Sequence, residues 1–79
     1  MLSPETIRIC RVNLDLSQGQ LARMAGISAS LLGQIERLDK PLHPDVARKI
    51  REAIEMTDEQ IEELVSVTKK IKKGGKING

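Results

Sequence analysis

Signals for the start of a helix recur along this chain, and they constrain its fold more than any other feature of the sequence. Ser3-Pro4-Glu5 combines an N-cap residue, a proline suited to the first helical position and an acid near the positive end of the helix dipole. The segments 17–20 and 57–60 have the capping-box pattern, in which Gln follows Ser or Thr at the third position. No segment alternates apolar and polar residues as a half-buried strand does. The sequence therefore predicts an all-α fold.

Apolar residues three or four positions apart follow each of these signals. The pattern predicts a compact bundle of about five short helices: 4–13, a second between Ser17 and Gly26, a third from 28 to 37 or 38, a fourth from 44 to about 54, and a fifth over 57–72. We expect their inner faces to carry Ile7, Cys10, Leu14, Leu21, Ala22, Ala25, Leu32, Ile35, Val46, Ile50, Ile54, Ile61, Leu64, Val65, Thr68 and Ile71. Met24 and Met56 are expected to fill gaps between helices. The prediction is one domain over 1–72, with 73–79 as a flexible basic tail.

The composition excludes several functions. Phe, Tyr and Trp are absent, which removes the modes of single-stranded nucleic-acid binding that stack bases on aromatic rings. One His and one Cys cannot form an intact four-ligand zinc site. No apolar run approaches the roughly 20 residues of a membrane span, and no secretory leader is readable, so we expect a cytoplasmic protein. No Ser, Cys or His has a base at an interpretable spacing, so the sequence predicts neither an enzyme nor a cofactor.

The charge balance is mild, with 13 basic and 11 acidic residues and a net charge of +2. This is not the imbalance of a protein that coats DNA without sequence preference. The last predicted helix has its acids at the front, in 58–63, and lysines at the back, in 69–76, as the helix dipole favours. Any binding of nucleic acid must therefore come from the placement of charge rather than from its sum.

The segment 18–37, QGQLARMAGISASLLGQIER, fits two short helices joined by a tight turn. Ala22 is small enough for a close helix crossing, and Gly26 can adopt the left-handed conformation that ends a helix. Ile27, Leu32 and Ile35 can clamp the second helix against the first. The spacing is that of a helix-turn-helix unit.

This segment resembles the Cro and lambda-repressor type of helix-turn-helix domain, the XRE family. The likeness is strongest from Leu16-Ser17-Gln18 to Ile35-Glu36-Arg37 and extends over about residues 7–54. It implies a compact bundle of four or five helices. It also implies a sequence-specific binder of double-stranded DNA that regulates transcription, usually as a dimer.

The resemblance also implies roles for individual positions. The residues that match the base-facing side of the recognition helix are Ser28, Ala29, Ser30 and Gln34. The residues that match phosphate contacts are Gln18, Arg37 and Lys40. Arg11 and Glu36 match a structural salt bridge between the first and third helices.

Some positions depart from the family pattern. Asp15 stands where a turn glycine is expected, although Asp tolerates the left-handed conformation. Only Gln34 has the two-pronged chemistry that suits adenine, and Leu31 is expected to face outward. Gly33 offers no side chain to a base, but it could allow a close approach to the DNA backbone.

The main prediction is a Cro-like repressor that binds a two-fold operator as a weak homodimer. The alternative is a protein-interaction module on the same fold, which binds another regulator or acts like an antitoxin through Leu31 or the helix at 57–72, with weak DNA binding or none.

Overall fold

The computed structural model describes the backbone of residues 2–78 and the side chains of residues 2–70. Five helices follow one another: α1 (Pro4–Asn13), α2 (Gln18–Ala25), α3 (Ala29–Glu36), α4 (Pro44–Ala53) and α5 (Asp58–Asn78). Residues 2–78 contain no strand, so the predicted all-α fold is confirmed. The helix α5 continues to Asn78, past the end predicted for the fifth helix at 72. The flexibility predicted for 73–79 stays a prediction.

Local capping starts four of the five helices. The hydroxyls of Ser3, Ser17 and Ser28 each accept a hydrogen bond from a backbone N–H in the first turn of the next helix. Thr57 and Gln60 form a reciprocal capping box, with Thr57 N–H donating to Gln60 Oε1 at 2.9 Å. At α4, His43 occupies the N-cap position without a side-chain hydrogen bond, and Pro44 begins the helix. The helix starts therefore agree with the caps expected from the sequence.

The core is apolar and is shared by all five helices. Its fully buried larger side chains are Ile7, Cys10, Leu21, Leu32, Ile35 and Ile50. Leu64 and Val65 pack against the core while half-buried, as does Met56. Met24 is 48% exposed, so its predicted place in a gap between helices is wrong: it lies on the outer face of α2. The residues described in full contain no buried polar or charged residue.

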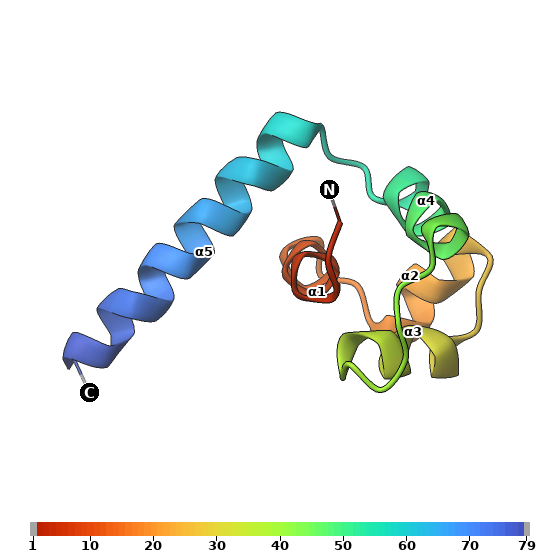
Figure 1. The fold of residues 1–79 in the computed structure, drawn as a ribbon. Coiled ribbons are helices and arrows are strands. Elements are labelled where there is room, and N and C mark those ends of the chain that lie inside the picture. Colours follow the sequence, from red (N-terminus) through yellow and green to blue (C-terminus); the bar gives the residue numbers. More distant parts are fainter. Residues whose placement is uncertain (1, 79) are drawn as a thin grey trace.

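The helices pack around α1. Figure 1 shows α1 end-on at the centre, with α2, α3 and α4 on one side of it and α5 on the other. The helix α2 packs against α3 and α4, and α1 packs against α3 and α5. The arrangement leaves α3 and α5 each with one face outside the bundle.

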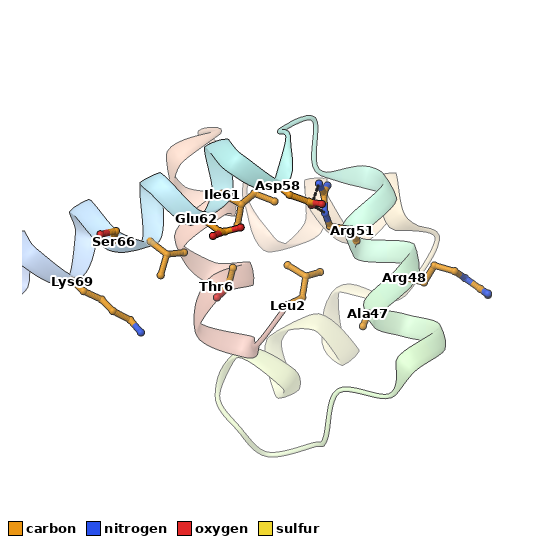
Figure 2. Close-up of a pocket in the computed structure, with 11 residues that line it drawn as sticks. Leu2, Thr6, Ala47, Arg48, Arg51, Asp58, Ile61, Glu62, Ser66 and Lys69 are labelled. Carbon is orange, nitrogen blue, oxygen red and sulfur yellow. Dashed lines mark hydrogen bonds and ion pairs between the residues drawn. The ribbon is translucent and has the colours of Figure 1, made fainter.

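Arg51 fastens the segment between α4 and α5, a role that the sequence analysis did not assign. Its guanidinium donates to the carbonyl oxygens of Ile54 and Met56. It also donates to Asp58 Oδ1, with Nη2 2.6 Å from that oxygen (Figure 2). The hydrogen bond from Arg51, together with its charge, holds the pKa of the Asp58 carboxyl below its ordinary value. One arginine therefore donates hydrogen bonds both to a backbone carbonyl at the end of α4 and to the first side chain of α5.

Candidate nucleic-acid interface

The segment that joins α2 to α3 is a tight left-handed turn. Gly26 has φ +74°, and the N–H of Ile27 donates to the carbonyl of Ala22 at 2.9 Å. Ala22 is fully buried in the core between the helices, where a larger side chain would separate them. The structure thus has the α2–turn–α3 geometry that the sequence predicts.

The start of α3 lies on the surface. Ser28, Ala29 and Ser30 are all exposed, and Gln34 is half-buried one turn further along. The Ser28 hydroxyl accepts from the N–H of Leu31 at 3.0 Å, so its acceptor capacity is partly used in capping α3. Ser30 and Gln34 are four residues apart and share one face of the helix. Three small side chains and one amide are therefore available to a molecule that approaches α3 from outside.

Leu31 is half-buried rather than fully outward. The apolar contact surface expected at this position is smaller than the sequence suggests.

Gly33 is buried where α3 meets α2. A Cβ at this position would lie 3.2 Å from Gln18 Oε1 and 3.2 Å from Arg37 Nη1. These two side chains fill the space above the glycine, so it is not open to a DNA backbone. Because Gly33 has no side chain, the side chains of Gln18 and Arg37 can pack over α3 at this position.

Arg11 and Glu36 form a two-pronged ion pair. Arg11 Nε lies 2.8 Å from Glu36 Oε2 and Nη2 lies 3.0 Å from Oε1, with side-chain exposures of 15% and 3%. Arg11 Nη1 also donates to the carbonyl of Leu16 at 2.9 Å. The pair ties the end of α1, the α1–α2 connector and the end of α3 together, so it fixes the orientation of α3 in the bundle.

Gln18, expected at a phosphate, is drawn into the same network. Its Nε2 donates to Glu36 Oε1 at 3.2 Å, so one of the two amide hydrogens is engaged inside the protein. As the first residue of α2, Gln18 still carries a backbone N–H with no partner in the helix ladder, at the positive end of the helix dipole. An anion at this end of α2 would therefore meet the backbone rather than the whole side chain.

Arg37 and Lys40 lie in the exposed segment after α3. Arg37 Nε is 3.1 Å from Asp39 Oδ2, and both side chains are about 60% exposed (61% and 59%). The N–H of Lys40 donates to the carbonyl of Gln34 at 3.3 Å, which holds the segment against the end of α3. Arg37 and Lys40 are both exposed to solvent, although the carboxylate of Asp39 partly offsets the charge of Arg37.

Leu38 is a feature of this segment that the sequence analysis missed. It has φ +66° and is 76% exposed, so a bulky residue adopts the conformation that usually belongs to glycine. Asp15 has φ +58°, which agrees with the expectation that Asp can replace the glycine of the first turn. The signal for Leu38 was its place just after the last residues of α3, where a left-handed residue commonly ends a helix.

A recess of about 750 Å³ lies away from α3, between α1, α4 and α5 (Figure 2). Leu2, Ile61 and Val65 line it together with Arg51 and Asp58, which are bonded to each other. It holds none of the residues expected at DNA.

Neither a metal site nor a reactive thiol is visible in the part of the chain that the structure describes. No group of three His, Cys, Asp or Glu side chains there could hold a metal ion. Cys10 is buried in the core, and burial raises the pKa of its thiol, which disfavours the reactive thiolate. None of the described helices is long and apolar enough to cross a membrane.

The α2–turn–α3 unit, packed on three further helices with the start of α3 exposed, defines a helix-turn-helix domain. The family model described as Helix-turn-helix matches residues 7–61, and the chain therefore belongs to this family, the Cro/C1-type or XRE domains. Membership implies DNA binding and a part in transcriptional regulation, and the family is not catalytic. No curated protein and no solved structure matches the chain.

Proposed function

We propose that this chain is a repressor that binds a two-fold operator in double-stranded DNA, with α3 of each copy in the major groove. The observation that carries the proposal is the exposed start of α3, on the helix along which Gln18 of α2 and Arg37 meet at Gly33. A helix presented in this way fits the width of the major groove. A bound copy would block access of other proteins to the promoter.

The proposal divides the exposed residues into two groups. Ser28, Ala29, Ser30 and Gln34 face base edges, where the Ala29 methyl group suits thymine and the Gln34 amide suits adenine. Contacts to phosphates come from the N-terminus of α2 at Gln18, and from Arg37 and Lys40. Phosphate contacts set the register of the protein on the duplex, and base contacts set the sequence preference.

The first experiment is selection from a random duplex pool at physiological salt, with sequencing over several rounds. We expect enrichment of a short two-fold motif. Protein that is folded by circular dichroism and enriches no motif would overturn the proposal.

Two variants then separate the roles of the residues. Gln34→Ala should lower discrimination at one or two base pairs, by about 1–3 kcal/mol per lost two-pronged contact. Arg37→Ala should weaken binding to all duplexes alike and reduce the slope of affinity against salt by about one. Equal, sequence-independent losses from both variants would contradict the assignment.

The small side chains at 28–30 favour a second candidate, a protein-interaction module on the same fold. Such a module would bind another regulator rather than read bases. The salt dependence of binding discriminates the two, because phosphate contacts release counterions and an apolar protein contact does not.

A further inference from the structure

Arg37 lies at the end of α3, but its side chain extends back along the helix. Arg37 and Gly33 are four residues apart, so they share one face of α3 and lie one turn from each other. Arg37 Nη1 is 3.2 Å from the place where a Cβ of Gly33 would be. The guanidinium therefore occupies space that a side chain at position 33 would fill.

The turn after α3 holds the guanidinium from the other side. Leu38, with φ +66°, reverses the chain. Its N–H donates to the carbonyl of Ile35 at 3.0 Å, and the N–H of Asp39 donates to that of Gln34 at 2.8 Å. These two bonds form a Schellman motif, which places the Asp39 carboxylate 3.1 Å from Arg37 Nε. Arg37 is thus held by Asp39 at Nε and by the surface of α3 under Nη1.

Gln18 of α2 meets Arg37 at the same place. Its Oε1 also lies 3.2 Å from the Cβ position of Gly33, and its Nε2 donates to Glu36 at 3.2 Å. The guanidinium is thereby kept beside the residue that begins α2, whose backbone N–H has no partner in the helix ladder. The Arg37 side chain is 61% exposed, so a molecule that approaches from solvent can reach it in this position.

We propose that Gly33 is a positioning residue for DNA binding. Its missing side chain lets Arg37 reach back to the start of α2, so that one phosphate binds the guanidinium and the N-terminus of α2 together. Glycine weakens the interior of a helix, and here the cation uses the room that glycine leaves. The inference rests on the proposed function and adds to it a residue that itself touches no DNA.

The order of Arg37 in the free protein is what makes its position matter. A long side chain that becomes fixed only on binding loses rotamer freedom, which weakens the complex by about two- to tenfold. Because Asp39 and the surface of α3 already hold Arg37, most of this loss precedes the arrival of DNA. A side chain at position 33 would displace the guanidinium and restore the loss.

The test is the affinity of the full chain for a duplex of mixed sequence in roughly 50 mM salt, where phosphate contacts dominate binding. Gly33→Ala should weaken binding about threefold, because the added Cβ displaces the guanidinium without removing its charge. Arg37→Ala should weaken it about tenfold. Adding Gly33→Ala to Arg37→Ala should cause no further loss, because no guanidinium is left to displace. A purely structural role of Gly33 predicts the same loss with and without Arg37.

Gly19→Ala is the matched control, since it makes the same change in the helix α2. A Cβ at Gly19 would have only Ser17 Oγ within 4 Å, at an ordinary contact distance of 3.9 Å. We expect this variant to bind the duplex within about twofold of the original chain. Circular dichroism of each variant separates weaker binding from loss of folding.

The side-chain Nε–H of Arg37 provides a measurement that needs no DNA. In the original chain this group donates to Asp39. In NMR spectra of the free protein, Gly33→Ala should shift the Nε–H signal toward that of an unrestrained arginine, whereas Gly19→Ala should leave it in place. An unchanged signal in Gly33→Ala would overturn the proposal.

Two results from the binding experiment would also overturn it. One is an equal effect of Gly33→Ala and Gly19→Ala, and the other is a loss from Gly33→Ala that persists without Arg37. A folded chain that binds no duplex refutes the proposed function instead. A chain that binds DNA but is indifferent to Gly33→Ala refutes the role of Gly33 alone.

Discussion

Arg11 is the side chain through which three separate parts of the chain meet. Its guanidinium contacts Glu36 through two nitrogens and the carbonyl of Leu16 through the third. Arg11→Met keeps much of the aliphatic stem but leaves a carboxylate that is 3% exposed without its cation. We expect the free energy of unfolding to fall by about 3 kcal/mol, as for a broken buried pair. Urea denaturation with a fixed probe measures the loss.

Arg37→Met is the matched control, because it breaks the ion pair with Asp39 on the surface. Both of these side chains are about 60% exposed (61% and 59%), and exposed pairs are worth less than about 1 kcal/mol. A loss from Arg11→Met no larger than from Arg37→Met would show that the two-pronged pair does not hold α3.

Asp58 makes stability depend on pH in acid. Because Arg51 lowers the pKa of this carboxyl in the folded state, the folded protein binds its proton less readily than the unfolded chain. The stabilisation is therefore present above the ordinary pKa of 3.8 and is lost as pH falls through the lower, folded value. Asp58→Asn should flatten the fall in thermal midpoint below pH 4, and NMR titration of the carboxyl should give a pKa below 3.8. An unshifted titration would contradict the bond to Arg51.

A left-handed residue follows both α2 and α3, but one is a glycine and the other is a leucine. Gly26 ends α2 at φ +74° and Leu38 follows α3 at φ +66°. Leu38→Gly should raise the free energy of unfolding by about 1 kcal/mol, because the strain of a Cβ in this region exceeds the entropy that glycine loses. Little packing is lost, since Leu38 is 76% exposed. Thermal and urea unfolding measure the gain.

Two further variants test the reason for that gain. Gly26→Ala should cost about 1 kcal/mol from backbone strain alone, since nothing lies within 4 Å of an added Cβ. Leu38→Ala keeps a Cβ and should give no gain. A gain from Leu38→Ala equal to that from Leu38→Gly would point to the exposed leucine itself rather than to φ.

Elements set by neighbouring residues could be predicted from the sequence, and contacts between distant residues could not. The caps at Ser3, Ser17 and Thr57 depend on three or four adjacent residues, so their pattern locates the helix starts. Gly33 looked like an empty position on α3, because only the folded chain brings Gln18 over it. The bond from Gln18 to Glu36, 18 residues away, likewise has no local signature.

The same distinction applies to faces of helices. Helical spacing predicted the buried positions of α3 and α4, but it did not exclude Met24 from the interior or reveal that Arg51 joins α4 to α5. The exposure of an apolar residue at the edge of a helix's buried face depends on which neighbouring helix covers it. The partners of a long cationic side chain near a helix end depend in the same way on the segment that packs beside it. The outer side of α3 was expected from the family resemblance, whereas the partial burial of Leu31 depended on tertiary packing.

At the scale of the whole molecule, the spacing of the operator follows from the size of the domain. The chain has a radius of gyration of 12.9 Å, so one copy covers about one half-site. Two copies related by a two-fold axis place their α3 helices about 34 Å apart, one turn of B-DNA.

Inserting five base pairs between the half-sites rotates one half-site relative to the other by about half a turn. We expect such an operator to bind only as strongly as a single half-site in a gel-shift titration. An operator of unchanged length with substituted central base pairs is the control, and it should keep most of the affinity of the original. Undiminished binding after the insertion would mean that the copies bind independently, and the two-fold mode of the proposal would then be wrong.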